Sequence, residues 1–356
     1  MSDRLFLVES DAAGLHAALV ADRRLQAIEI DRTDHPTQVG GVATARVVRT
    51  IPGLGTIVKL ADGTELLLDR GGPPPKAGDE IAVQPTRAPH GEKLGTASRA
   101  IALTGRGVVH LPHDSGIRFS RRLEIDETRR GMLEPLVVGK PGAWIFRRGA
   151  GHLGETDLTA EIAALAAEGQ GRAIAPPDAF RRLATDHAAG PPHRILAAGL
   201  AARRTVERWC RSFAPSLEAQ IEPVESGLFD LYDLDEAISM LAEALVMLPG
   251  GGSLAIEPTE ALTVIDVNAG PEANAVSVNL AAAAEIGRQL RLRHIGGIVV
   301  IDFISLPRPR DRERIVEALK AAVADDPSQT YILPMSALGL VEMTRERRGP
   351  GLEFER

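Results

Sequence analysis

The sequence predicts a multidomain protein of the α+β class. Its 356 residues are enough for two or three domains of ordinary size, each with its own core. From about Thr37 to Ala100 the chain consists of short β-prone segments separated by turn signals, whereas after residue 253 strand-like and helix-like segments alternate. A small β barrel of the OB type and a separate α/β unit account for these two patterns.

Composition and charge indicate a soluble, cytoplasmic globular protein. Hydrophobic residues make up 44% of the chain and charged residues 25%. The net charge of −7 argues mildly against a nucleic-acid binder, although it is compatible with a local basic groove. The N-terminus lacks a basic region followed by an apolar stretch, and no apolar run has the length of a membrane span, so we expect neither a secretory signal nor a membrane partner. The single cysteine, Cys210, excludes an internal disulfide framework, and a buried thiol is expected.

The first hundred residues are expected to form two strands around a helix, followed by the barrel. Residues 4–8 (RLFLV) and 25–30 (LQAIEI) have strand character, and the alanine-rich residues 12–24 between them have helical character. Pro-Gly and Asp-Gly turns separate the short strands of the barrel. Residues 69–79 form its loop-like interruption.

Basic residues and helical patterns dominate the middle of the chain. A basic cluster at 119–131 (FSRRLEIDETRRG) precedes a strand, AWIFRR, and a glycine-rich turn, GAGHLG. That turn has too little pattern for a nucleotide-binding loop, and no Walker-type lysine follows it. Alanine-rich helical patterns cover 157–168 and 195–213, and a loop within 222–248 leads into a further helix.

The last third of the chain is expected to alternate strand and helix, over 253–267, 278–293, 297–304 and 311–324. Residues 262–267, 278–293 and 297–304 form a βαβ unit, in which the two strands are parallel neighbours or near-neighbours. The uninterrupted apolar character of both strands predicts burial on both faces of the sheet.

Both strands of this βαβ unit end in an aspartate. LTVIDVNAG delivers Asp266, with Asn268 two places later on the same strand face, and GGIVVIDFIS delivers Asp302. Ligand sites of open α/β sheets lie beyond the carboxyl ends of the strands, so the two carboxylates are expected to converge. A lone aspartate at a strand end is more often a turn or cap residue, but two on paired strands beside an amide favour a metal site.

Two adjacent carboxylates repel each other unless a cation neutralises them. Mg²⁺ suits this pair because it prefers hard oxygen ligands and leaves positions for water and phosphate oxygens. The chemistry that such a site serves is hydrolysis of a phosphate ester, in which the metal neutralises developing charge and activates water.

At this point the sequence resembles a known family. TEALTVIDVNAG, VNLAAAAEIGRQLRLRHIGGIVVIDFISL and ALGLVEMTRERRGP are similar to the catalytic region of the ribonuclease E/G family of bacterial endoribonucleases, and RLFLVESDAAGLHAALVADRRLQAIEI is similar to its opening segment. The resemblance implies an RNase H-like subdomain (1–36 and 191–241), interrupted by an OB-fold RNA-binding barrel (37–102) and a 5′-sensor-like region (103–190), and followed by a DNase I-like α/β catalytic subdomain (242–356).

The resemblance also implies roles for individual residues. Asp266 and Asp302 match the paired magnesium ligands of the family, and Asn268 matches the amide beside the attacked phosphate. One Mg²⁺ site is expected, with Mn²⁺ as a substitute ion and no zinc. RNA contacts are expected from basic residues of the barrel, of the sensor segments SRRLE and WIFRRGAG, and of the helix before Asp302: Lys93, Arg121, Arg122, Arg147, Arg148, Arg288 and Arg291. For the last two, a solvated helix face is an equally good interpretation.

The sequence departs from the family pattern in four places. It lacks the Cys-x-x-Cys zinc link that joins protomers, so a homodimer is conceivable but a zinc-linked tetramer is not supported. The loop after Asn268 is shortened and lacks the family's arginine. Residues 38–100 contain no Phe, Tyr or Trp, with Val58 and Leu66 or Leu67 roughly where family aromatics would be, which weakens base stacking. Finally, an arginine pair replaces arginine–threonine in the sensor segment.

Three functional hypotheses follow. The first is a Mg²⁺-dependent endoribonuclease that cuts single-stranded RNA in rRNA or mRNA processing or decay, leaving 5′-phosphate and 3′-hydroxyl ends. The second is a catalytically weak or inactive relative that binds RNA or a protein partner. The third is a metal-dependent phosphodiesterase acting on another substrate. The acidic pair with its amide favours the first, whereas the acidic net charge, the shortened loop and the barrel without aromatic residues favour the second.

Overall fold

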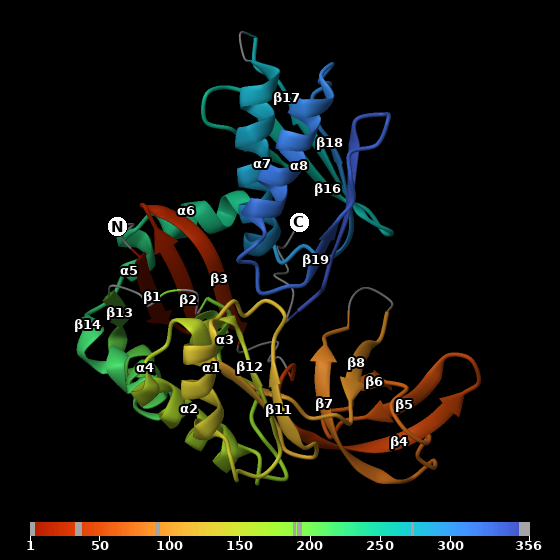
Figure 1. The fold of residues 1–356 in the computed structure, drawn as a ribbon, viewed down its shortest axis with the longest axis vertical. Helices are drawn as coiled ribbons and strands as arrows, with labels where there is room; N and C mark the ends of the chain where they lie inside the picture. Colours follow the sequence, from red (N-terminus) through yellow and green to blue (C-terminus); the bar gives the residue numbers. More distant parts are fainter. Residues whose placement is uncertain are drawn as a thin grey trace. The chain divides into compact units, whose positions relative to one another are not determined.

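The computed structural model describes residues 4–32, 38–89, 93–187, 190, 194–271 and 274–348. The chain forms two compact units, the first from Met1–Arg24 and Ile28–Leu228 and the second from Leu25–Ala27 and Phe229–Arg356 (Figure 1). None of the helices in the described ranges is both long and apolar enough to cross a membrane. The four boundaries between the predicted subdomain segments stay predictions, and those near residues 36 and 190 fall in or beside residues outside the described ranges.

The first unit contains a five-stranded sheet assembled from distant parts of the sequence. Its order is β14 (Ile221–Val224), β13 (Arg194–Ala198), β1 (Arg4–Ser10), β2 (Gly14–Ala21) and β3 (Arg24–Arg32). β1 runs antiparallel to β2 and parallel to β13.

Two helices, α3 (Ala179–Asp186) and α4 (Gly199–Phe213), pack against this sheet. Edge-to-face ring contacts join the elements, with centroids 6.1 Å apart for Phe6 and Phe180 and 5.2 Å apart for Phe180 and Trp209. Cys210 is buried on α4, as predicted, and its burial raises the pKa of the thiol to about 12.

The helix predicted over residues 12–24 is wrong, because this segment is strand β2. Asp22 and Arg23 adopt positive φ angles of 50° and 59°, which reverse the chain tightly into β3. β2 is hydrogen-bonded between β1 and β3, and this pairing outweighs the helical preference of its alanines. The helix predicted over 195–213 is likewise shorter, because its first residues form β13 in the same sheet.

A closed five-stranded barrel follows, as predicted for the OB-type region. Val58, Leu66 and Val83 are among the side chains that fill it. Residues 69–79, predicted as a loop, contain no helix or strand. The strands in barrel order are β4 (Ala43–Ile51), β5 (Gly55–Lys59), β6 (Glu65–Leu68), β8 (Gly95–Ser98) and β7 (Glu80–Arg87), which pairs with β4.

A four-stranded sheet occupies the region predicted to be sensor-like. Its order is β11 (Gly116–Phe119), β12 (Ala143–Phe146), β10 (Val108–Leu111) and β9 (Leu103–Thr104). β11 and β12 are parallel, whereas β10 is antiparallel to both β12 and β9. Helix α2 (Glu155–Glu168) packs on β10 and on α4. The short elements around this sheet are α1 (Glu127–Leu133), η1 (Glu134–Leu136), η2 (Arg148–Gly151) and η3 (Pro215–Gln220).

The second unit is a six-stranded sheet with a helical layer on one face. Helices α7 (Ala275–Leu292) and α8 (Pro309–Ala322) lie side by side against the sheet (Figure 1). The Asn274 side chain caps α7 by accepting hydrogen bonds from the backbone N–H groups of Val276 and Ser277. The strand order is β15 (Leu245–Met247), β16 (Ser253–Pro258), β17 (Thr263–Asn268), β18 (Gly297–Asp302), β20 (Leu340–Arg345) and β19 (Thr330–Ile332), and α5 (Leu228–Leu231), α6 (Leu234–Ser239) and η4 (Met240–Ala242) precede the sheet.

Two sequence-based expectations for this unit are wrong. The strand predicted over 253–267 is a hairpin, because residues 259–262 form a turn between β16 and β17. The strands are also buried on one face only. Ile265 and Ile301 face the helices and are fully buried, whereas Ile298 on the other face is 50% exposed. Both helices pack on the same face, so nothing in the described residues of this unit covers the other; we call it the open face.

Candidate functional site

Asp266 and Asp302 lie side by side on the open face of the second unit. β17 and β18 are parallel neighbours, and Asp266 and Asp302 are direct register partners at their carboxyl ends. Neighbouring strands are about 4.8 Å apart, and register partners project to the same face. Both side chains are exposed. The register of β17 and β18 by itself therefore places the two carboxylates next to each other, as the sequence predicted.

The alternation of each strand explains why the acids face outward. In β17 the buried residues are Thr263, Ile265 and Val267, so Asp266 and Asn268 project from the opposite face. The Asn268 amide nitrogen donates a hydrogen bond to a carboxylate oxygen of Asp266 at 2.9 Å. This bond restrains the Asp266 side chain at the strand end.

The direct register partners of the two acids on the neighbouring strands are uncharged. Across β16 the register partner of Asp266 is Ala255, and across β20 the partner of Asp302 is Leu340. Two adjacent carboxylates without a cationic side chain in their row carry an unbalanced negative charge, which a bound cation would neutralise.

The donor chemistry of the pair fits Mg²⁺. Mg²⁺ is commonly held by one or two carboxylates and completes its shell with water and substrate phosphate oxygens. Within the described residues, no group of three or more His, Cys, Asp or Glu is arranged to hold a metal ion. Asp266 and Asp302 are thus a two-carboxylate set of the kind that Mg²⁺ uses.

Two arginine pairs follow the carboxyl ends of adjacent strands in the four-stranded sheet of the first unit. The backbone N–H of Ser120 donates to the carbonyl of Phe146 at 2.9 Å, so the parallel strands β11 and β12 stay paired to their ends. The chain then continues into Arg121 and Arg122 after β11, and into Arg147 and Arg148 after β12. Parallel strands therefore bring two arginine pairs to one sheet edge, a basic position suited to a phosphate.

Arg147 is held more firmly than the exposed pair Arg121 and Arg122. Its side chain is 23% exposed and lies 3.9 Å from the carboxylate of Asp186. One guanidinium nitrogen donates to the carbonyl of Gly105 at 2.5 Å. Arg148 begins the short helix η2 and is half-buried.

The outer surface of the barrel carries aliphatic and basic side chains. Lys93 is exposed just before β8. Of the positions matched to family aromatics, Val58 and Leu66 point into the barrel core, whereas Leu67 does not. The cross-strand row that projects away from the barrel interior is Arg49, Ile57, Leu67 and Thr96, in which Ile57 is buried and Leu67 is half-buried.

Arg288 and Arg291 lie on α7, in the helical layer opposite the open face. Arg288 pairs with Glu285 at 2.5 Å, and Arg291 donates to the carbonyl of Ala322 at 3.0 Å. Arg288 and Arg291 are both half-buried, and burial lowers the pKa of Arg291. Contacts of Arg288 and Arg291 with RNA stay a prediction. The placement of both residues in the helical layer does not favour it.

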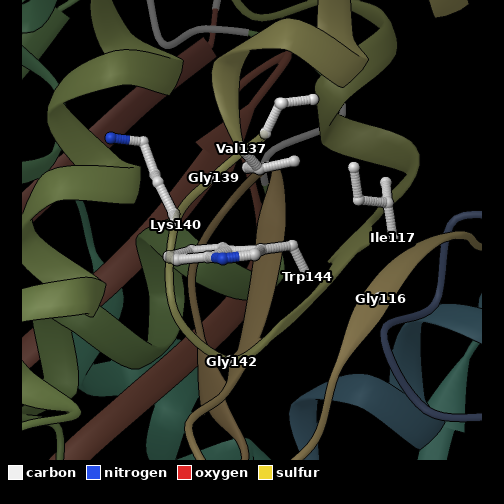
Figure 2. Close-up of a pocket in the computed structure, with 8 residues that line it drawn as sticks. Gly116, Ile117, Val137, Gly139, Lys140, Gly142 and Trp144 are labelled. Atoms are coloured by element: carbon white, nitrogen blue, oxygen red, sulfur yellow. The ribbon is translucent and has the colours of Figure 1, made fainter.

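A small pocket opens at the other end of the sensor-like sheet (Figure 2). It has a volume of about 230 Å³ and includes Ile117, Lys140 and Trp144 in its lining. The indole of Trp144 lies beneath Val137 in this view and stacks on His110, with ring centroids 4.1 Å apart. The pocket sits at the amino ends of β11 and β12, so it is separate from the arginines at their carboxyl ends.

Sequence reasoning missed two acids of this region: Asp186, which lies beside Arg147, and Glu161, which accepts hydrogen bonds from the turn between β9 and β10. Asp186 follows no motif, and Glu161 lies inside an alanine-rich helix, where a charged residue ordinarily faces solvent. The available signal was the four-residue spacing of Asp157 and Glu161, which places both on one side of α2.

Comparison with known proteins identifies the family of this chain. The sequence model of the Ribonuclease E/G family matches residues 102–348, more than half of the chain. This protein belongs to the ribonuclease E/G family.

The curated relatives extend the similarity over most of the chain. A protein of Escherichia coli (strain K12) named Ribonuclease G is 28% identical over 376 aligned positions, which cover 92% of this chain and 77% of that protein. Ribonuclease G of Haemophilus influenzae is 26% identical, covering 94% of this chain and 78% of that protein. Ribonuclease E of Nostoc sp. is 29% identical over 299 positions, covering 77% of this chain and 44% of that protein.

Proposed function

We propose that this protein is an endoribonuclease that hydrolyses phosphodiester bonds of single-stranded RNA with the help of Mg²⁺. The observation that carries the proposal is the register pairing of Asp266 with Asp302 on an open sheet face. The family membership and the names of the relatives, Ribonuclease G and Ribonuclease E, support RNA as the substrate and its processing as the role. Both rRNA and mRNA are substrates of this chemical class.

The proposed mechanism assigns each residue of the acidic site one task. Asp266 and Asp302 would hold Mg²⁺, with Mn²⁺ as a substitute, and a bound ion would neutralise charge on the phosphate and lower the pKa of an attacking water. The hydrogen bond from Asn268 restrains the Asp266 carboxylate, and its amide would lie beside the attacked phosphate. Attack by water at phosphorus, rather than by the ribose 2′-hydroxyl, would leave 5′-phosphate and 3′-hydroxyl ends.

Arg121, Arg122, Arg147 and Arg148 follow the carboxyl ends of β11 and β12, and we call this position the arginine edge. It would bind the 5′-terminal phosphate of the RNA. Arg147 and Arg148 supply guanidinium groups at the end of β12, and the exposed Arg121 and Arg122 add positive charge beside them. Lys93 would contact the RNA backbone on the barrel. Because these contacts are to phosphates, binding should weaken as the salt concentration rises.

A second candidate function is an RNA-binding or partner-binding relative with little or no cleavage. One observation favours it: Leu67, on the outside of the barrel, is aliphatic, and its cross-strand neighbour Ile57 is only 2% exposed, so neither offers an aromatic ring for base stacking. Binding would then depend on phosphate contacts alone.

A cleavage assay separates the two functions. We would incubate a fluorescent, 5′-monophosphorylated, A/U-rich oligonucleotide with Mg²⁺ or with chelator, using wild type and Asp302→Asn. Cleavage should require Mg²⁺ and fall about 10²- to 10³-fold in the variant, the scale on which loss of one charge-stabilising group slows a reaction. Asp311→Asn, the same change at an α8 residue paired with Arg308, should cleave normally.

Binding without cleavage in every sample would establish the second function instead. Cleavage that persists in chelator, or in Asp302→Asn at the wild-type rate, would refute the metal-dependent mechanism.

A further inference from the structure

A buried carboxylate lies directly behind the arginine edge. Glu161 on α2 is fully buried and points into the turn between β9 and β10. Its oxygens accept hydrogen bonds from three consecutive backbone N–H groups, of Arg106 at 2.7 Å, Gly107 at 2.8 Å and Val108 at 2.9 Å. One side chain thus satisfies every backbone donor of this turn from Arg106 to Val108.

A second acid on the same helix, Asp157, binds the side chain of Arg106 in this turn. The guanidinium of Arg106 donates to Asp157 at 2.7 Å and lies 3.9 Å from Glu161. Asp157 also accepts from the hydroxyl of Ser216 at 2.7 Å. Burial raises the pKa of Glu161, whereas Arg106 and the three N–H groups lower it. Arg106 and the three backbone N–H groups therefore offset part of the cost of burying this carboxylate.

The far side of this turn binds Arg147 at two points. The backbone N–H of Arg147 donates to the carbonyl of Gly107 at 2.7 Å, and its guanidinium donates to the carbonyl of Gly105 at 2.5 Å. The turn also packs tightly against the acid, because a Cβ on Gly105 would lie 2.5 Å from the Glu161 carboxyl group. Glu161 and Arg147 therefore hold the same four-residue turn from opposite sides.

We propose that Glu161 is a positioning residue for recognition of the RNA 5′-phosphate. It fixes the carbonyl groups of Gly105 and Gly107, and these carbonyls fix the backbone and the guanidinium of Arg147. The inference rests on the proposed role of the arginine edge, and it adds a residue that touches neither RNA nor the acidic pair.

Replacing the carboxylate by an amide tests this arrangement with little change of volume. In Glu161→Gln the amide oxygen can still accept from Gly107 and Val108, but the amide NH₂ then faces the N–H of Arg106, and two donors cannot bond each other. The turn should open at Arg106 and release Arg147. Glu168→Gln is the matched control, since Glu168 is on the same helix and pairs with Arg181 at 2.6 Å instead. Gly105→Ala disturbs the same contact from the other side without removing the charge.

Two readouts are needed. Fluorescence anisotropy in chelator would compare binding of one oligonucleotide with a 5′-monophosphate and with a 5′-hydroxyl, so that it does not depend on cleavage. Steady-state kinetics with Mg²⁺ would compare KM and kcat on the same pair, and thermal unfolding would check the fold.

We expect the preference for the 5′-monophosphate to fall about tenfold in Glu161→Gln and in Gly105→Ala, as one buried donor loses its partner. The change should appear in KM, with kcat on 5′-hydroxyl RNA unchanged and Glu168→Gln behaving as wild type. If folded Glu161→Gln keeps the wild-type preference, or loses activity on both RNAs equally, the inference is wrong while the proposed function stands. If wild type itself shows no preference in either readout, the sensor role fails and the inference with it.

Discussion

The protein uses one structural device twice, with opposite charge. In the second unit the parallel strands β17 and β18 end together in two carboxylates, and in the first unit the parallel strands β11 and β12 end together before two arginine pairs. Adjacent parallel strands necessarily bring their carboxyl ends to the same sheet edge. One edge is therefore suited to a cation and the other to an anion, although their strand pairing is the same.

The two edges differ in what holds the charged groups. Asp266 and Asp302 belong to the strands, so the backbone ladder places them without further help. Arg147 follows its strand, and its position depends on a turn that a buried glutamate fixes from behind. Charged residues that are themselves register partners need little further support. A charged residue that follows the end of its strand depends on more distant residues for its position.

The largest expected effect tests whether the acidic pair acts as one unit. Asp266→Asn and Asp302→Asn should each lower single-turnover cleavage about 10²- to 10³-fold. The double variant should lose little more than either single variant, because two groups that bind the same ion are not additive. Multiplicative losses in the double variant would show that the two acids act separately.

The next effect tests the arginine edge. Arg147→Ala should lower the preference for 5′-monophosphorylated RNA by about tenfold or more, because a charge-assisted hydrogen bond is lost. Cleavage of 5′-hydroxyl RNA should be unaffected. Arg118→Ala removes an exposed arginine of the same sheet, paired with Asp114 at 2.8 Å, and serves as the control. An equal loss in both variants would indicate general charge attraction in place of a defined site.

The smallest effect concerns the barrel, which contains neither the acidic pair nor the arginine pairs. Leu67 lies on its outer surface and is half-buried. Leu67→Phe should raise RNA affinity about fivefold, near the lower limit for stacking of one base. Val138→Phe adds a ring at an exposed apolar position outside the barrel and should change nothing. A gain in the control alone would place the RNA away from the barrel surface.

The sequence predicted the acidic site better than its surroundings. Apolar runs ending at Asp266 and Asp302 specify buried strands with polar ends, and the intervening helix makes the strands parallel. The same runs wrongly predicted burial on both faces, because periodicity does not show where a second helical layer packs. Helical propensity also failed for β2, where pairing on both edges decided the conformation.

By itself the sequence determined the local chemistry: two acids and an amide at strand ends, arginines beside a strand, and a barrel without aromatic rings. Only the tertiary structure decided that Asp266 is the register partner of Asp302, that Arg288 and Arg291 turn inward, and that Glu161 supports Arg147. The physical reason is distance along the chain. Residue type and spacing govern contacts within a few residues, whereas Glu161 and the turn it holds are more than fifty residues apart and meet only once the core has formed.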